Sequence, residues 1–274
     1  MLVLFAAVAL LAAIAGARHP AGESIARVLD RREAALRQFG AWIAAVVSVL
    51  VVWFTWDALM PLPTVHDESS YLLQADIFAR LRWTAPPPPI ADFFEQPHVL
   101  VAPAVASKYP PGHALLLAAG VLVGFPALVP LLLTAVTAAL LFALAMRVTN
   151  PWTALLAWLV WLTAPLVLRF QPSYFSELTT TALVLASWWV LLEWRETRRR
   201  HWLLVLALAI GWGAITRPLT MLAFALPIGA VVLHDAARLR LWRDVGMAFA
   251  VGVAVLSVLP LWSARTTGDW RVSP

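Results

Sequence analysis

The sequence predicts an all-α integral membrane protein, a bundle of about eight transmembrane helices whose first outer loop is partly helical. Of the 274 residues, 62% are hydrophobic and only 13% are charged, whereas a soluble domain has about 45–50% apolar and about 25% charged residues. The mean hydropathy is +0.81, and 15 tryptophans suit the two interfaces of a bilayer. These values exclude a soluble globular protein, a disordered tail and a nucleic-acid-binding module.

The net charge, the absence of cysteine and the absence of common motifs limit the kinds of site that the chain can contain. The formal charge of +5 could indicate a polyanionic partner, but the placement of the arginines decides that question. The chain has no cysteine, which excludes disulfides, thiolate metal sites and a cysteine nucleophile. The sequence contains no glycine-rich phosphate loop, HExxH motif or zinc-ligand spacing. No metal ligands are therefore predicted, although a divalent cation stays open as a cofactor.

Stretches without charged residues predict the crossings. In chain order they are Met1–Ala17, Phe39–Trp56, His113–Met146, Pro151–Leu168, Leu178–Leu192, His201–Thr216, Pro218–His234 and Val245–Ala264. The first is interpreted as a short helix, although its end also resembles a signal-peptide cleavage site. The third would be about 51 Å long as one helix, well beyond a hydrocarbon core of ~30 Å. Pro126 and Pro130 divide it into an interfacial helix, His113–Gly124, and one span.

The distribution of arginine gives the orientation. If the chain turns at Arg217-Pro218, so that two crossings meet there, 13 of the 20 Lys and Arg residues lie on one side of the membrane and 7 on the other. Basic residues collect in cytoplasmic loops, so this asymmetry favours eight crossings with both termini outside. Residues 1–38 then form an extra N-terminal helix and a cytoplasmic Arg-rich segment. Residues 39–274 form the transmembrane module, which includes a large outer loop at residues 61–112.

The outer loop divides into three parts. The spacing of apolar residues in Asp67–Trp83 predicts an amphipathic helix that lies along the membrane surface. Its apolar face contains Tyr71, Leu72, Ala75, Phe78, Ala79 and Leu81, and its polar face contains Gln74, Asp76, Arg80 and Arg82. Ile90–Ser107 predicts a short surface hairpin. The segment Lys108-Tyr109-Pro110-Pro111-Gly112 predicts a fixed irregular backbone, because its prolines cannot continue a helix.

His66-Asp67-Glu68, just after the second predicted span, is the first candidate for chemistry. One interpretation is structural: Asp67 caps the following helix, and both acids oppose its dipole. The other interpretation is functional, because partial desolvation at the boundary between water and lipid strengthens a carboxylate as a general base. Of the six histidines, only His66 and His113 lie beside this predicted site.

Further ionisable residues fall on the same predicted side of the membrane. Glu177 opens the fifth span, where it could equally oppose the helix dipole. Arg217 lies between two short spans, and a cation at that depth costs about 2.5–3.5 kcal/mol unless it snorkels to the surface or pairs with an anion such as a lipid phosphate. Lys108 and Arg169 lie on the same face and could share that role.

The order of four motifs along the chain indicates a family resemblance. They are Asp67-Glu68-x-x-Tyr71 after a span, Lys108-Tyr109-Pro110-Pro111-Gly112-His113 at the end of the outer loop, Ser176-Glu177, and Thr216-Arg217-Pro218. The chain, over about residues 39–274, resembles the integral-membrane C-type glycosyltransferases (GT-C), specifically the bacterial branch similar to protein O-mannosyltransferases and lipid A aminoarabinose transferases (glycosyltransferase family 39-like). Relatives continue past Thr267-Gly268-Asp269, so the resemblance implies a short or C-terminally truncated form.

This resemblance implies a set of site residues and substrates. Asp67 would be the catalytic general base. With the residues argued above, the substrate-binding set is Glu68, Tyr71, Lys108, Tyr109, His113, Arg169, Glu177 and Arg217. The implied donor is a sugar linked to polyprenyl phosphate, and the acceptor is a glycan, lipid or protein. The reaction would occur on the outer, periplasmic face of the bacterial cytoplasmic membrane.

Two other function classes stay open from the sequence. A flippase or transporter of lipid-linked sugars would use broken helices and charges near the midplane, whereas the unusual charges here fall at one face. A non-catalytic or truncated membrane scaffold of the same fold would not need Asp67, Lys108 and Arg217 to converge.

Overall fold

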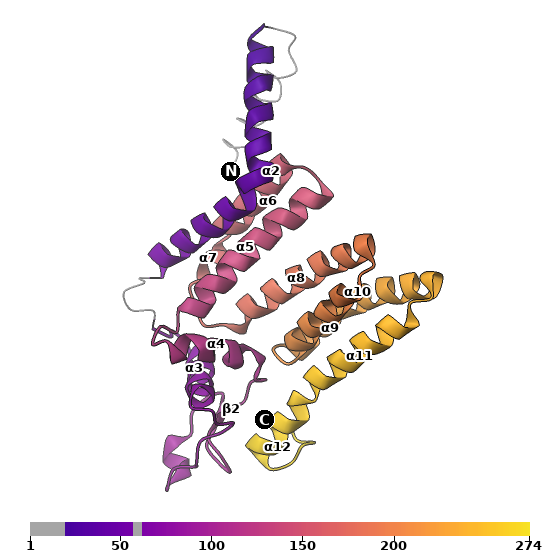
Figure 1. Cartoon of the computed structure of the whole chain (residues 1–274). Helices are drawn as coiled ribbons and strands as arrows, with labels where there is room; N and C mark the ends of the chain where they lie inside the picture. Colours follow the sequence, from indigo (N-terminus) through magenta and orange to yellow (C-terminus); the bar gives the residue numbers. More distant parts are fainter. Residues whose placement is uncertain (1–19, 57–61) are drawn as a thin grey trace.

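The computed structural model describes residues 20–56 and 62–274, with side chains from residue 32 onward (Figure 1). It is 74% helical with almost no sheet, which confirms the prediction of an all-α fold. The predicted first helix, Met1–Ala17, lies outside the described residues.

Two groups of helices form the bundle, and α5 and α8 pack against each other between them (Figure 1). The first group consists of α2 (Pro20–Thr55), α5 (Leu128–Val148), α6 (Pro151–Thr163) and α7 (Pro165–Phe170). The second consists of α8 (Ser176–Thr197), α9 (Arg200–Ala214), α10 (Pro218–Leu239), α11 (Trp242–Leu256) and α12 (Val258–Thr267). α5 packs on α2 and α6, and α9 contacts α8, α10 and α11. The helix α2 runs without a break across the predicted boundary at residues 38 and 39.

Four helices among the described residues are long and apolar enough to cross a membrane. They are Arg32–Thr55, Leu128–Val148, Pro218–Leu239 and the α11–α12 pair Trp242–Thr267. The chain is therefore an integral membrane protein by the length and composition of its helices, but the predicted number of eight crossings is not supported.

Breaks and polar residues explain why the other predicted spans fall short. Pro165 interrupts the predicted span Pro151–Leu168, so that α6 ends at Thr163 and α7 restarts with the proline in its first turn. The 15 residues of α9 measure about 22 Å, less than a core of ~30 Å. α8 has 22 residues, but its polar residues, such as Glu193, make it less apolar than the helices that can cross a membrane. A charge-free stretch in the sequence is therefore not always one long helix.

The outer region lies at one end of the bundle, together with α12 (Figure 1). Its elements are α3 (His66–Ala79), η1 (Ala91–Phe94), β1 (Val99–Leu100), β2 (Ala106–Ser107) and α4 (Gly112–Leu122). β1 and β2 pair antiparallel, which confirms the predicted hairpin. The chain then divides as predicted into α4 and the longer α5.

α3 is not the amphipathic surface helix that the sequence predicted. It buries Glu68, Ser70 and Gln74 and packs against α4, although Gln74 was expected on the polar face. The side-chain carbonyl of Gln74 accepts a hydrogen bond from the backbone N–H of Ser107, 3.0 Å away. Leu81, expected on the apolar face, is 93% exposed. The helix therefore docks on protein through polar contacts that apolar periodicity cannot reveal.

Ion pairs join the helices at the other end of α8, remote from the outer region. The pairs are Arg147 with Glu193 and Glu196, Arg195 and Arg198 with Asp235, and Arg200 with Asp244, at 2.6–3.1 Å. We call these contacts the distal ion pairs. They connect α5 to α8, the end of α8 to α10, and α9 to α11. Each pair therefore holds the C-terminal or N-terminal end of a helix to a neighbour.

Candidate functional site

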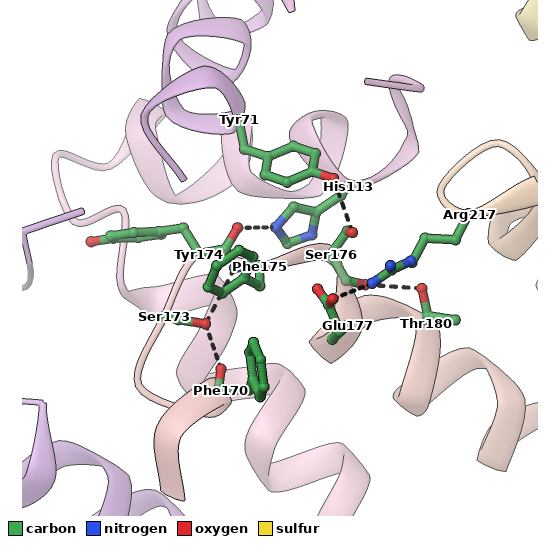
Figure 2. Close-up of polar contacts among 10 residues, drawn as sticks. All are labelled: Tyr71, His113, Phe170, Ser173, Tyr174, Phe175, Ser176, Glu177, Thr180 and Arg217. Carbon is green, nitrogen blue, oxygen red and sulfur yellow. Dashed lines mark hydrogen bonds and ion pairs between the residues drawn. The ribbon is translucent and has the colours of Figure 1, made fainter. Parts of the chain in front are cut away.

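Tyr71 lies at the centre of the candidate site, where α3, α4 and the start of α8 meet (Figure 2). Its side chain is buried, and its hydroxyl donates a hydrogen bond to the hydroxyl of Ser176 at 3.0 Å. Burial raises the pKa of Tyr71 to about 12, and the charges of Glu177, Arg217 and Asp67 also act on it. The three charges therefore lie around one phenol, although they belong to three different segments.

Four rings extend this site into an aromatic stack. The rings of Tyr71 and Tyr109 are stacked, with centroids 4.7 Å apart and planes at 23°. His98 stacks on Tyr109 at 5.4 Å, and His113 meets Tyr71 edge-on at 4.9 Å. The stack joins α3 and α4 to the outer loop, so that the loop backbone is fixed at the position of Tyr109.

Asp67 contacts two members of this stack. Its Oδ1 lies 2.9 Å from Nε2 of His98, and the hydroxyl of Tyr109 donates a hydrogen bond to the same carboxylate. Burial and this acidic neighbour raise the pKa of Tyr109, so the phenol keeps its proton and stays a donor. Asp67 is not the N-cap of α3, which is Val65, but Asp67 and Glu68 both lie in the first turn, where they oppose the helix dipole as the structural interpretation predicted. The Asp67 side chain is 36% exposed, which leaves it accessible.

His113 is fully buried and holds two segments together. Its Nε2 lies 2.7 Å from the backbone oxygen of Tyr174, and its Nδ1 lies 2.8 Å from the hydroxyl of Thr179. A carbonyl only accepts, so Nε2 carries the proton and Nδ1 accepts from Thr179. Burial lowers the pKa of His113 to about 4. The neutral ring therefore links α4 to the start of α8, and both nitrogens are used; Figure 2 shows the contact with Tyr174.

Glu68 is also buried and engaged by protein groups. Its Oε1 accepts from the hydroxyl of Thr64 at 2.9 Å and from the backbone N–H of Thr64 at 3.3 Å. Its Oε2 accepts from the backbone N–H of Tyr174 at 3.0 Å. Glu68 therefore ties the start of α3 to the segment that precedes α8, next to the exposed Asp67.

Glu177 and Arg217 form an ion pair that borders a groove. Figure 2 shows the two side chains pointing toward each other, from the first turn of α8 and from the turn before α10. The groove has a volume of about 210 Å³, and its other walls come from Thr180, Thr181, Val184, Leu185, Thr220 and Phe224. Polar groups at one place and apolar walls between two helices suit an amphiphilic molecule with an anionic group.

Gly112 explains why the predicted irregular segment ends in glycine. Its N–H donates to the backbone oxygen of Ile215 at 2.9 Å, and its carbonyl accepts from the indole N–H of Trp212 at 3.0 Å. A Cβ at this position would lie 2.4 Å from the hydroxyl oxygen of Thr216. The outer loop therefore docks on the end of α9, beside Arg217, only because residue 112 has no side chain.

The remaining predicted residues lie apart from this cluster. Arg169 on α7 is exposed and has no ion pair or hydrogen bond with a described residue. Lys108 is exposed beside Tyr109. His66, predicted beside the site, is exposed on the first turn of α3. His98 takes the place next to Asp67 instead, which corrects the expectation that His66 and His113 are the only histidines there.

Sequence reasoning also missed Thr179, the partner of His113. Its spacing gave one signal that was not used, because Ser176 and Thr179 are three residues apart and share one face of α8. Within residues 32–56 and 62–274, no three His, Cys, Asp or Glu side chains are grouped closely enough to hold a metal ion.

Fold and site together define an all-α integral membrane protein with a cluster of acids, bases and aromatic rings at one end of its bundle. The sequence model of the dolichyl-phosphate-mannose-protein mannosyltransferase family matches residues 108–263, more than half of the chain. The chain belongs to this family, which is of the GT-C type, and the membership indicates a glycosyltransferase. Tyr109, His113, Glu177 and Arg217 lie within the matched residues, whereas Asp67 precedes them. No curated protein and no solved structure matches the chain.

Proposed function

We propose that this glycosyltransferase moves a sugar from a polyprenyl-phosphate-linked donor to an acceptor glycan, lipid or protein, with Asp67 as the general base. The observation that carries the proposal is that the aromatic stack and the bond to Ser176 place Tyr71 between Asp67 and the ion pair of Glu177 and Arg217. The family membership supports the reaction class, since the family is named for a lipid-linked sugar donor.

The groove beside Glu177 and Arg217 supports a lipid-linked donor. Its walls between α8 and α10 are mostly apolar and suit an isoprenoid tail. A guanidinium binds phosphate through paired hydrogen bonds, so Arg217 is the proposed partner of the donor phosphate. Because Arg217 pairs with Glu177, phosphate binding exchanges one anionic partner for another and frees Glu177 to contact the sugar.

The proposed chemical step is a displacement at the anomeric carbon of the donor sugar. The acceptor hydroxyl attacks the anomeric carbon, a new C–O bond forms, and the C–O bond to the phosphate breaks. Asp67 takes the proton of the hydroxyl, while the polyprenyl phosphate leaves with the electron pair. Arg217 offsets the charge that grows on the leaving phosphate. His98 and Tyr109 hold the Asp67 carboxylate in place for this transfer.

The other predicted residues divide by their contacts. Glu68 and His113 act as positioning residues in this proposal, because protein donors and acceptors engage both of them. Tyr71 and Tyr109 form the stacked wall of the site. A direct role for Arg169 stays a prediction, since it lies apart from the cluster.

The proposed location is the bacterial cytoplasmic membrane, with Asp67 on the periplasmic side. α8 begins at Ser176, beside Tyr71. At its other end lie many arginines, which belong to the ends of α8 and α10 and to the start of α9. The positive-inside rule places that basic end in the cytoplasm. The outer loop then faces the periplasm, where a lipid-linked sugar and a water-borne acceptor can meet.

The test is sugar transfer by the full chain in liposomes. Polyprenyl phosphates carrying mannose, glucose or aminoarabinose are supplied with an oligosaccharide, a lipid or a peptide acceptor, and the released polyprenyl phosphate is measured. We expect release from at least one donor, and Asp67→Asn to lower it about 10²–10⁴-fold, as for loss of a general base.

Asp92→Asn is the matched control, because Asp92 is an exposed carboxylate of the same outer loop. It should transfer sugar at the wild-type rate. Wild-type turnover retained by Asp67→Asn would remove the base assignment, and release from none of the donors would remove the proposed donor class.

A further inference from the structure

A second recess lies between the outer loop and the C-terminal part of the chain. Its volume of about 640 Å³ is within the range of about 300–1,000 Å³ that small-molecule sites occupy. Its walls include Lys108 and Pro110 from the outer loop, Pro218 from the start of α10, and Trp262, Trp270 and Arg271 from α12 and the segment after it. No role in the reaction above uses this recess.

The charged walls of the recess are both cationic. Lys108 and Arg271 are exposed, and no Asp or Glu is among the described residues that line the recess. Asp269 is the nearest acid along the chain, and its carboxylate accepts from the backbone N–H of Arg271 at 2.9 Å. Neither cation has an ion pair with a described residue. The recess therefore offers two free positive charges to an anion.

Trp262 adds a fixed aromatic wall to the recess. The residue is 2% exposed, and its indole N–H has no partner within the described part of the chain. Its ring is held between chain segments, with centroids 5.7 Å from Phe78 and 6.5 Å from Trp83. The ring of Trp262 therefore forms a fixed wall of the recess, since its N–H is itself buried.

The recess adjoins the proposed active site. Lys108 precedes Tyr109, whose hydroxyl contacts Asp67. Pro218 follows Arg217, so the turn before α10 contributes one residue to the donor groove and the next to the recess. A molecule in the recess would therefore lie across this turn from the donor, with the general base close to both.

We propose that the recess binds the acceptor, and that the acceptor is a saccharide that carries a phosphate or carboxylate group. This inference rests on the proposed function. Lys108 and Arg271 bind the anionic group, and the buried ring of Trp262 forms a fixed wall beside it. Trp270, which is 60% exposed, and the prolines provide apolar surface for the C–H face of the ring.

The test is direct binding to the full chain in detergent, measured by calorimetry with mannose 6-phosphate, glucuronic acid and neutral mannose as probes. We expect both anionic sugars to bind at least 10-fold more tightly than mannose. Arg271→Gln should weaken binding about 10-fold. Arg265→Gln is the matched control on α12, because Arg265 is exposed but does not line the recess.

The outcomes separate the recess from the proposed reaction. Equal binding by Arg271→Gln and Arg265→Gln, or no binding of either anionic sugar, overturns the proposal. Binding that phosphatidylglycerol nanodiscs abolish, while neither sugar competes, assigns the recess to lipid and also overturns it. Asp67→Asn should bind the anionic sugars normally yet transfer nothing. If the wild type binds them but releases polyprenyl phosphate from no donor, the proposed function fails while the saccharide site is supported.

Discussion

The two ends of α8 use charge in different ways. At the distal end, each acid of the ion pairs lies within 3.1 Å of a basic partner, and most pairs join different helices. At the Ser176 end, Asp67 contacts a histidine and a phenol, and the side chains of Glu177 and Arg217 are 37–39% exposed. Exposure alone does not separate the two ends, because Arg195, Arg200 and Glu196 are 48–66% exposed. The distal charges join one helix to another, whereas Glu177 and Arg217 border a groove that makes the Ser176 end accessible to a substrate.

Replacing one arginine at each end tests this division most strongly. Arg217→Gln removes the proposed phosphate partner, so sugar transfer should fall about 10²–10³-fold with little change in Tm. Arg147→Gln leaves Glu193 and Glu196 without their cation, so Tm should fall while transfer stays near the wild-type rate. Release of polyprenyl phosphate and thermal unfolding in detergent measure the two effects.

The opposite result for either arginine variant would contradict the division between the two ends of α8. If folded Arg147→Gln lost as much transfer as Arg217→Gln, the distal ion pairs would belong to the catalytic machinery. If Arg217→Gln lowered Tm as much as Arg147→Gln, the pair with Glu177 would serve stability instead.

Gly112→Ala tests whether the docked outer loop fixes the accessible end. The added Cβ would lie 2.8 Å from the backbone oxygen of Ile215 and 2.4 Å from the hydroxyl oxygen of Thr216. Backbone cannot give way easily, so we expect a loss of about 2–3 kcal/mol of stability and weaker transfer through displacement of Tyr109. Gly252→Ala is the control, because a Cβ there meets nothing within 4 Å. Equal stability of both variants would mean that the loop is not held at Gly112.

The sequence predicted the helical class, the hairpin, the division into α4 and α5, and the irregular segment before Gly112. Local rules sufficed there, because hydropathy, prolines and chain length act within a few residues. It could not place Gly112 against Trp212, because that hydrogen bond joins residues 100 positions apart. It also overestimated the crossings, since the charge-free run 151–168 was counted as one span although Pro165 divides it.

The candidate site was predictable to a similar extent. The motif order pointed to Asp67, Glu177 and Arg217, and the structure brings all three around Tyr71. His98 was missed, because the hairpin that carries it to Asp67 has no signature in a single sequence. Glu68 was expected to touch substrate but is buried among protein donors, since burial of a polar residue contradicts the pattern that sequence reasoning uses.

His113 makes the stability of the protein depend on pH at the Ser176 end of α8. Its pKa is about 4 in the folded protein and about 6.5 when exposed, so the unfolded chain binds more protons between these values. Stability from the neutral ring is present above pH 6.5 and is lost as pH falls toward 4, by about 2 kcal/mol at pH 5. Tm should therefore fall between pH 7.5 and 5 in the wild type.

Replacement of two histidines checks that assignment. His113→Gln should unfold at a lower temperature at pH 7.5 but should lack the part of the pH-dependent fall that His113 causes. His234→Gln, at an exposed position on α10, should keep the wild-type pH dependence. An unchanged fall in His113→Gln would show that another group titrates.

Tyr71→Phe should have the smallest effect on stability and on sugar transfer. It tests how far the accessible end of α8 extends. The variant keeps the stacked ring but removes the hydrogen bond to Ser176, which costs about 1 kcal/mol of stability. Because the hydroxyl is buried and already bonded to protein, transfer should fall by less than about 10-fold, in contrast to Asp67→Asn. Ser176→Ala removes the same bond from the other side and should match Tyr71→Phe in both Tm and transfer. A 100-fold loss of transfer in Tyr71→Phe alone would mean that the phenol itself contacts the reacting sugar, and the accessible end would then extend further into the bundle than the contacts of Tyr71 indicate.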